Sequence, residues 1–275
     1  MNTKEFVLAL SKVKRWGLTK VANYVIKHGY DFEECLNFLE LELDSNELRS
    51  FNDNLLIAQE EIKTNENKNI KLLTLFDNNF PKKLCECSEP VIYLFYVGDI
   101  SLLSSKCLTI VGTRNPTEPF ISLGEKVTKY YASKGITIVS GLALGCDTIA
   151  HRATLDVKGK TIAVLPSALD KIVPTQNKEL ARDIVRNGGL VISEYSVTSI
   201  MNKFNYPQRD RIQSLISNIS IIIQSKNDGG TMIAAKKSLK DGKNVFAIKG
   251  NQLEVVNNYL DPKDLEQLNK VHELI

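Results

Sequence analysis

Short apolar runs alternate with helical patterns along more than half of the chain, from about residue 107 to residue 248. The runs are rich in Val, Ile and Leu and nearly continuous, as in Leu108–Val111 and Ile219–Gln224. Strands of a parallel sheet have this composition because helices bury both of their faces. Alternation of strand and helix over this length predicts an α/β fold with a doubly wound, mostly parallel sheet.

The same pattern gives each element a place along the chain. Two strands, 70–76 and 91–97, precede the regular alternation and extend the sheet. The later predicted strands are 108–111, 136–140, 161–165, 190–195, 219–224 and 245–248. The helices predicted between them are 118–134, 148–157, 178–187, 209–217 and 231–240. A last helix is expected after the Asp261-Pro262 pair.

The N-terminal quarter of the chain has a different pattern. Residues 1–66 show helical spacing of apolar residues, which predicts about four short helices. The polar run 64–69 is interpreted as a linker. We therefore predict a small all-helical domain over 1–66 and an α/β domain over 67–275. Basic residues around Trp16-Gly17 allow a helix-hairpin-helix that contacts DNA, or a solvated helical cap.

Composition narrows the class of protein. The chain has 275 residues, 43% hydrophobic and 24% charged, which is ordinary for a soluble globular protein. No apolar run is long enough to span a membrane, and the N-terminus lacks the apolar segment of a signal peptide. The five cysteines are scattered and there are three histidines, so we expect no metal, reduced thiols and a cytoplasmic location. The net charge of +3 leaves nucleic-acid binding open.

One turn in this pattern suits an anion. The stretch Cys107–Thr117 reads C-L-T-I-V-G-T-R-N-P-T, a strand that stops at Gly112 before a helix. Glycine lets the backbone approach a ligand, and the helix N-terminus that follows offers unpaired N–H groups. Arg114 adds a permanently charged fork suited to phosphate. The turn lacks both G-x-G-x-x-G and G-x-x-x-x-G-K-[ST], and the alternative is an ordinary turn with a surface arginine.

The next predicted turn combines small residues with two titratable ones. Ser140, Gly141 and Gly145 leave room for a ligand at the carboxyl edge of the sheet. Asp147 is placed as an N-cap that accepts from the first turn of its helix. His151 follows one helical turn later, and we expect it to be packed and hydrogen-bonded to Asp147 or to the backbone. The alternative is an acid–base couple formed by these two residues.

Further cations and glycines fall on the other turns of that edge. Lys178 is predicted in the first turn of a helix, where a positive charge is unfavourable unless an anion binds. Arg209 and Arg211 are predicted at another helix start, for which the same reasoning holds. The segment Asp228–Thr231 is glycine-rich and opens a helix, so it is a second candidate anion cradle. No nucleophile–base pair stands out, and this set of residues suits holding phosphates better than breaking bonds.

A series of motifs runs in order along the α/β part of the chain. They read V-G-T-R-N-P-T, S-G-L-A-L-G-C-D-T-I-A-H-R-A-T-L, T-I-A-V-L-P-S-A-L-D-K-I-V-P-T-Q-N-K-E-L, N-G-G-L-V-I-S-E-Y, N-Y-P-Q-R-D-R-I, and G-G-T-M-I-A-A followed by V-F-A-I-K-G. Together they resemble the DNA-processing protein A family, also called DprA or Smf. The resemblance covers roughly Ile70 to Gly250, and the N-terminal helices resemble that family's SAM-like or helix-hairpin-helix cap only weakly.

This resemblance implies an extended Rossmann fold and a non-catalytic protein that binds single-stranded DNA. It also implies a homodimer that helps to load the recombinase RecA during natural transformation, with no cofactor and no membrane partner. The winged-helix domain that some members carry at the C-terminus is not found in this sequence. The phosphate-contacting residues that the resemblance implies are Gly112, Thr113, Arg114, Ser140, Gly141, Asn177, Lys178, Arg209, Arg211, Gly230 and Thr231.

The chain departs from the family's usual motifs at several positions, which mark it as a divergent member. Pro119-Phe120 replaces the usual Tyr-Gly, and Asp210 puts a negative charge between two arginines. A nucleotide or nucleoside-phosphate hydrolase on a similar scaffold stays open as an alternative function, and it would need a carboxylate such as Asp147 or Glu194 facing the pocket. An interaction scaffold that has lost ligand binding is the other alternative.

Overall fold

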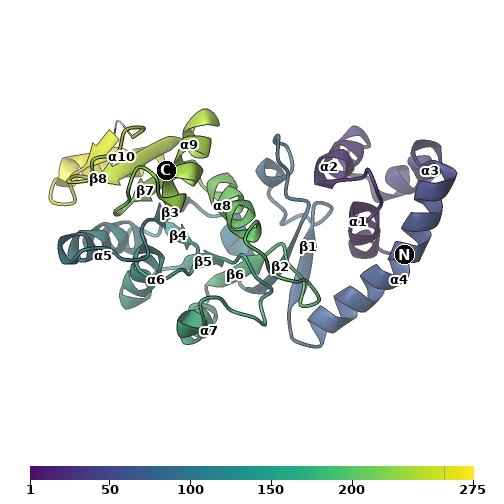
Figure 1. Cartoon of the computed structure of the whole chain (residues 1–275), viewed down its shortest axis with the longest axis horizontal. Coiled ribbons are helices and arrows are strands. Elements are labelled where there is room, and N and C mark those ends of the chain that lie inside the picture. Colours follow the sequence, from purple (N-terminus) through teal and green to yellow (C-terminus); the bar gives the residue numbers. More distant parts are fainter. Residues whose placement is uncertain (257) are drawn as a thin grey trace.

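The computed structural model describes residues 1–256 and 258–275. These residues form a nine-stranded mixed sheet covered by helices on both faces (Figure 1). The strands are β1 (Lys71–Thr74), β2 (Tyr93–Gly98), β3 (Cys107–Val111), β4 (Thr137–Ser140), β5 (Thr161–Val164), β6 (Leu190–Ser193), β7 (Ile219–Ile222), β8 (Asn244–Ile248) and β9 (Asn258–Leu260). The predicted extended Rossmann-like α/β fold is confirmed.

The helices follow the predicted alternation closely. Four lie before the sheet: α1 (Thr3–Ser11), α2 (Leu18–Lys27), α3 (Phe32–Glu42) and α4 (Ser45–Glu66). The others are α5 (Glu118–Ser133), α6 (Cys146–Asp156), α7 (Lys178–Arg186), α8 (Asn205–Ile216), α9 (Gly230–Lys240) and α10 (Leu265–Leu274). No helix among the described residues has the length and apolar composition needed to span a membrane.

The order of the strands places a topological switch at β3. The sheet runs β1-β2-β6-β5-β4-β3-β7-β8-β9, so the chain builds outward from β3 first in one direction and then in the other. The central strands are parallel, whereas β1 and β2 pair antiparallel at one edge. In open α/β sheets, ligands bind beside the carboxyl ends of the strands where the order reverses. Here that point lies between β3 and β7.

The structure differs from the prediction near both ends of the α/β region. Residues 64–66 of the polar run 64–69, which was predicted as a linker, belong to α4, which continues to Glu66. Asn65 is buried there, and its amide donates to Ser196 Oγ at 3.1 Å, which ties α4 to the loop after β6. Strand β9 was missed, because a three-residue strand in a polar tail carries little sequence signal.

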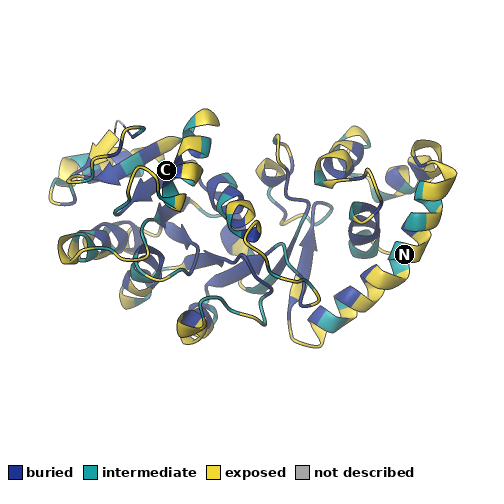
Figure 2. Ribbon diagram, in the orientation of Figure 1, coloured by how far each residue is buried: buried dark blue, intermediate teal, exposed yellow. Residues whose placement is uncertain are grey.

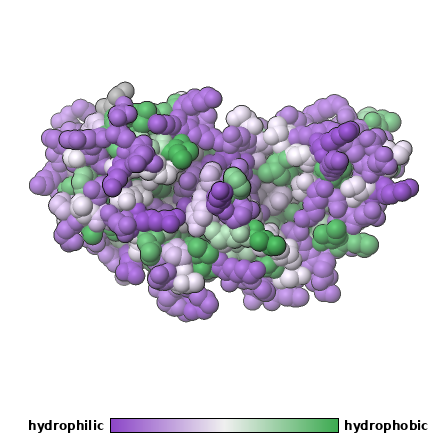
Figure 3. All heavy atoms as spheres, in the orientation of Figure 1, coloured by the Kyte–Doolittle hydropathy of each residue, from purple (hydrophilic) through white to green (hydrophobic). Residues whose placement is uncertain are grey.

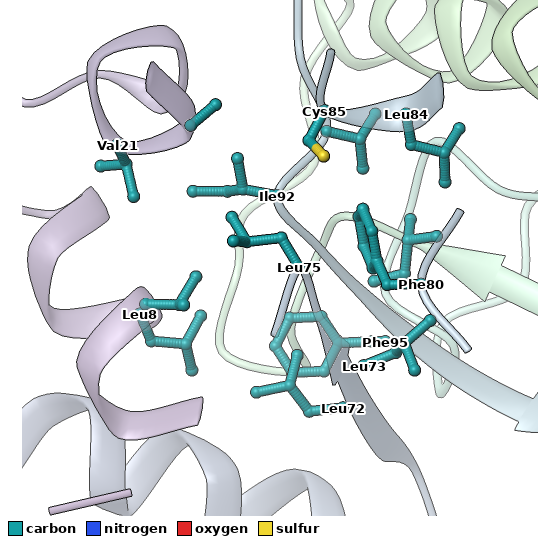
Figure 4. Packing of buried hydrophobic residues seen from close by; sticks show 14 of the residues in the cluster. Leu8, Val21, Leu72, Leu73, Leu75, Phe80, Leu84, Cys85, Ile92 and Phe95 are labelled. Atoms are coloured by element: carbon teal, nitrogen blue, oxygen red, sulfur yellow. The ribbon is translucent and has the colours of Figure 1, made fainter. Parts of the chain in front are cut away.

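The N-terminal helices share a hydrophobic core with the edge of the sheet. Leu8 and Val21 pack toward Leu72, Ile92 and Phe95 from β1, β2 and the segment between them (Figure 4). All five side chains are at most 5% exposed. Residue 66 therefore marks a change of secondary structure, and the division into two domains stays a prediction.

Burial follows the layers of the fold. The central strands are buried along their length, while the outer faces of the surrounding helices are exposed (Figure 2). The helical bundle lies beside β1 at one end of the molecule, and β8 and α10 lie at the other end (Figure 1). The face seen in Figure 3 is mainly hydrophilic, with small separate hydrophobic patches.

Candidate functional site

A cavity of about 410 Å³ opens at the switch point of the sheet. Its walls come from the turn after β3, the loop after β4, one face of α8, and the loop and first turns that follow β7. The lining residues are Val111, Gly112, Thr113, Arg114, Ala143, Asp147, Tyr206, Arg209, Asp210, Gln213, Ser225, Lys226, Asp228, Gly229, Gly230, Thr231 and Ala234. Loops that are far apart in the sequence thus meet at one hollow.

Many of the residues predicted for the phosphate site lie at this cavity. Those that line it are Gly112, Thr113, Arg114, Arg209, Gly230 and Thr231. Gly141 lines a smaller adjoining hollow of about 80 Å³, which shares Arg114 and Arg209 with the cavity. Phe120 is partly buried, packs against the hydrophobic core beside Gly250 and does not line the cavity. Contact of these residues with phosphate stays a prediction.

Two predicted residues support the loops from inside rather than facing the cavity. Ser140 is fully buried, and its hydroxyl donates to Ile110 O at 2.7 Å. Asn177 is also buried, and its amide donates to Leu142 O and to Thr148 Oγ1, both at 2.8 Å. Both side chains therefore hold the β4–α6 loop in place.

Two predicted cations lie elsewhere. Lys178 is exposed at the start of α7, beside a separate hollow lined by Leu169 and Ile172. Arg211 is 4% exposed and bonds away from the cavity, with Nη2 2.5 Å from Glu194 Oε2. These two cations, predicted at the same sheet edge as Arg114 and Arg209, therefore do not line the cavity.

The start of α8 explains why the two arginines separate. The helix begins at Asn205, four residues before the predicted start, so Arg209 and Arg211 lie beyond its first turn. Pro207 is compatible with this start because the first-turn N–H groups have no intrahelical partner. Residues two apart on an α-helix point in widely different directions. Arg209 therefore faces the cavity while Arg211 faces the loop before β2.

Arg209 is largely committed to contacts inside the protein. Its Nη1 donates to Gly141 O at 2.5 Å and to Val164 O at 3.3 Å, and its Nε lies 2.7 Å from Asp210 Oδ1. A Cβ at position 141 would lie 1.7 Å from Arg209 Nη1. Glycine at position 141 therefore makes room for this guanidinium, where the sequence suggested room for a ligand.

Gly112 also has an internal reason for lacking a side chain. A Cβ there would lie 2.6 Å from Cys146 Sγ and 2.7 Å from Gln224 O. The N–H of Thr113 donates to the same Gln224 carbonyl at 2.7 Å. Close packing of the ends of β3 and β7 against α6 therefore shapes this turn. Gly230 differs, because a Cβ there would meet nothing within 4 Å.

Asp147 has another role than the predicted N-cap. The N-cap of α6 is Gly145, at φ +77°, and Asp147 lies inside the first turn. Its Oδ2 accepts from the N–H groups of Gly141 at 3.2 Å and Ala143 at 3.3 Å, so it closes the loop that precedes its helix. Burial raises its pKa to about 6 despite Arg209, whose Nη1 is 4.0 Å from Oδ2.

His151 is a packed neutral histidine, as predicted, but its partner is Thr161. Its Nδ1 lies 2.8 Å from Thr161 Oγ1, and that hydroxyl donates to Ile138 O. Nδ1–H is therefore the donor, which fixes the tautomer. Burial lowers the pKa of His151 to about 3. Among the described residues, no hydrogen bond joins it to Asp147, so the acid–base couple is not formed.

The mouth of the cavity carries the predicted Arg114 together with Lys226 and Tyr206, two residues to which the sequence analysis gave no role. Arg114 and Lys226 are both exposed, and neither forms an ion pair with any residue that the structure describes. The guanidinium carbon of Arg114 lies 5.5 Å from the ring centre of Tyr206, a cation–π contact. Lys226 could have been found because it lies in the loop after β7, at the same sheet edge as Arg114. Tyr206 lies in the motif N-Y-P-Q-R-D-R-I, in which only the two arginines were predicted to contact phosphate.

The comparison with known families decides which family the chain is from. A family model described as DNA recombination-mediator protein A matches residues 71–259. The chain belongs to this family. Protein Smf from Synechocystis is 36% identical over 191 residues, which cover 68% of this chain and 48% of the relative. The chain spans 48% to 64% of the lengths of the first three curated relatives that it matches.

Solved structures of the family share the fold. The X-ray structure of DNA processing protein A from Streptococcus pneumoniae matches with a TM-score of 0.66 and 25% identity, covering 99% of this chain and 88% of that one. DNA processing protein A from Helicobacter pylori, described for its single-stranded DNA binding mode, matches with a TM-score of 0.60 and 31% identity, covering 74% of this chain and 87% of that one.

The described residues hold no cluster of His, Cys, Asp or Glu arranged for a metal ion. Cys85 and Cys87, which are separated by one residue, are free thiols. Burial raises the pKa of Cys146, which lies behind the glycine turn, to about 12. A thiol with so high a pKa is a poor nucleophile at neutral pH.

Proposed function

We propose that this chain binds single-stranded DNA, with the sugar–phosphate backbone held at the mouth of the cavity. The observation that carries the proposal is the pair Arg114 and Lys226, two exposed cations from neighbouring loops with no ion-pair partner among the described residues. The N-terminus of α9 opens beside them at Gly230, where space is free. Helix N-termini favour anions, and arginine suits phosphate.

Relatives support the choice of ligand. The Helicobacter pylori protein described for single-stranded DNA binding shares this fold at 31% identity. On the family resemblance, we extend the proposal to a non-catalytic, cytoplasmic homodimer that helps to load RecA during transformation. The resemblance also assigns a phosphate contact to Lys178. A bound DNA strand reaches Lys178 only if it continues from the cavity along α7. Ser140, Gly141, Asn177 and Arg211 then act by holding the loops.

The experiment is a fluorescence anisotropy titration with a labelled single-stranded oligonucleotide and its duplex. The proposal predicts tighter binding of the single strand and a loss of about tenfold in affinity for Arg114→Ala, the effect expected for one charge-assisted contact. Arg152→Ala is the matched control, because Arg152 is an exposed arginine on α6 outside the cavity lining. Equal affinity of Arg114→Ala and wild type would contradict the proposal.

One observation supports a second candidate, a nucleotide or nucleoside-phosphate hydrolase. Asp147 lines the cavity and has a pKa raised by burial to about 6, as acid–base residues often have. Glu194 is instead paired with Arg211. Incubation with nucleoside monophosphates and chromatography for released base or phosphate tests this candidate. Release that disappears in Asp147→Asn would support it, and absence of release from wild type would exclude these substrates.

A further inference from the structure

A hollow of about 320 Å³ lies beside another face of α8 than the one that lines the cavity. Figure 1 shows α8 between α9 and the segment that joins β1 to β2, and α8 contacts both. Arg211 and Asn218 of α8 line this hollow, whereas Arg209 lines the cavity. The charged residues of its lining are Lys83, Glu89, Arg211, Lys237, Asp241 and Lys243, and we call it the lysine hollow.

The lysine hollow has more cations than carboxylates. Two of its four cations, Arg211 and Lys237, are already paired with carboxylates. The other two, Lys83 and Lys243, form no ion pair with any residue that the structure describes. Asp241 is exposed, and it too pairs with no cation of the described residues. Two positive charges of the lining are therefore left without a carboxylate in direct contact among these residues.

The C-terminal end of α8 holds both of these ammonium groups. Lys83 Nζ donates to Ile216 O at 2.5 Å. Lys243 Nζ donates to Ser214 O and, at 3.4 Å, to Ser217 O. The last carbonyl groups of a helix attract cations, and an ammonium group has three N–H donors. The carbonyls therefore position the two ammonium groups and leave each of them at least one donor for a ligand.

Burial makes these two positive charges costly. It lowers the pKa of the ammonium groups of Lys83 and Lys243, although part of the Lys83 side chain stays exposed. Repulsion from Lys83 lowers the pKa of Lys243 further, so the two charges lie close enough to interact. A charge removed from water is expensive unless an opposite charge meets it. A small anion that contacts both lysines would offset this cost.

The size and the neutral polar groups of the lysine hollow indicate the kind of anion. Its volume lies at the lower end of the range of roughly 300–1,000 Å³ of pockets that hold small molecules. The hydroxyl of Ser88 and the amide of Asn218 are exposed in its lining, and neither side chain is hydrogen-bonded to a residue that the structure describes. Lysine binds phosphate as a point charge, and hydroxyl and amide groups donate to phosphate oxygens.

We propose that the lysine hollow binds a small molecule that carries a phosphate or diphosphate group, held between the ammonium groups of Lys83 and Lys243. This site is separate from the proposed DNA contact at Arg114 and Lys226, which lie at the mouth of the cavity. Lys83 comes from the segment between β1 and β2, and Lys243 follows α9. The bound ligand therefore links that segment to the end of α9 and stabilises the fold.

Isothermal titration calorimetry with sodium pyrophosphate tests the proposal. Wild type is expected to bind pyrophosphate, and Lys243→Met is expected to bind it about tenfold more weakly, as for the loss of one charge-assisted contact. Because Lys243 also bonds carbonyl groups of α8, a second variant keeps both lysines. Asn218→Asp places a carboxylate in the lysine hollow, where it should compete with pyrophosphate and weaken its binding. Lys236→Met is the matched control, since Lys236 is an exposed lysine of α9 that lines neither the hollow nor the cavity.

Two further measurements separate this site from the DNA site. Pyrophosphate should raise the Tm of wild type by a few degrees and leave the Tm of Asn218→Asp nearly unchanged. Lys243→Met and Asn218→Asp should both keep the wild-type affinity for single-stranded DNA. A parallel titration with ADP distinguishes two sources of the diphosphate group. Equal affinity for ADP and pyrophosphate supports a site for the free anion, and tighter binding of ADP supports a site for a nucleotide.

Two results would overturn the inference, whatever the result for DNA. One is the absence of pyrophosphate binding to wild type. The other is pyrophosphate binding that Lys243→Met and Asn218→Asp leave unchanged, because the anion would then bind elsewhere, for instance beside Arg114.

Discussion

Gly141 and Arg209 fit together, since the place where a Cβ of residue 141 would lie is taken by the Arg209 guanidinium, 1.7 Å from Nη1. The same guanidinium donates to the carbonyl of Gly141 at 2.5 Å. This contact links the β4–α6 loop to α8 across the cavity. The absence of a side chain at position 141 is therefore a condition for the shape of the site.

Substitution of Gly141 tests this relationship. Gly141→Ala should displace Arg209 and lower the free energy of unfolding by about 1–3 kcal/mol, the range for overpacking a filled interior. Gly230→Ala is the control, because a Cβ there meets nothing within 4 Å and alanine suits a helix. Urea denaturation of both variants measures the effect. Similar stability of the two variants would show that Arg209 can move to accommodate a side chain at position 141 at little cost.

Substitution of Arg211 should lower the stability of the fold strongly, whereas substitution of Arg114 should leave stability nearly unchanged. Arg211→Met leaves Glu194 buried without its partner, and removes two hydrogen bonds of 2.7 Å to Glu89 O and Pro90 O. Loss of one partner of a buried ion pair costs about 3–5 kcal/mol. Arg114→Ala, at an exposed side chain, should change stability by less than about 0.5 kcal/mol. Urea denaturation of each variant measures these changes. An Arg211→Met variant as stable as wild type would show that the contacts of Arg211 with Glu194, Glu89 and Pro90 are not needed for stability.

The buried His151 should make the protein sensitive to acid. Its pKa is lowered from 6.5 to about 3 in the folded state, so between these values the unfolded chain binds a proton that the folded chain does not. Stability is then lost as pH falls below 6.5, by at most about 1.4 kcal/mol per pH unit. His151→Asn keeps a donor near Thr161 and removes the titration. Relative to that variant, wild type should lose stability from pH 6.5 toward pH 4, and parallel profiles would contradict the assignment.

The pH dependence of stability that Asp147 contributes should be opposite in sign to that of His151. Its pKa is raised from 3.8 to about 6, so in this window the folded protein holds a proton that the unfolded chain releases. Stability from this group is present at low pH and is lost as pH rises through about 6. Asp147→Asn should therefore gain stability relative to wild type between pH 4 and pH 7. The unfolding free energies of wild type and Asp147→Asn, measured across that pH range, test this expectation. A difference that does not change with pH would contradict the raised pKa of Asp147.

The alternation of apolar runs and helices was enough to predict the sheet and the edge where its loops meet. That edge brought Gly112, Arg114 and Thr231 to one cavity, because parallel strands end on the same side. The internal roles of Ser140 and Asn177 were not visible, since a small or polar residue in a loop can face a ligand or hold a carbonyl.

The directions of side chains on α8 depend on where the helix begins. With the start at Asn205, Arg209 faces the cavity and Arg211 faces away. Gln213 follows Arg209 by four residues, and this spacing alone would have placed it on the same face. Lys178 lies at the predicted helix start, but beside a different hollow, and a linear sequence gives no distance between neighbouring loops.

Contact of Arg114 and Lys226 with DNA phosphates is tested most directly by the salt dependence of single-stranded DNA affinity for wild type, Arg114→Ala and Lys226→Ala. Each cation that contacts a phosphate contributes about 0.7 to the negative slope of log K against log salt for single strands. We expect wild type to bind with a clear negative slope, and each variant to bind more weakly with a slope shallower by about that amount. Slopes and affinities equal to those of wild type would contradict this expectation.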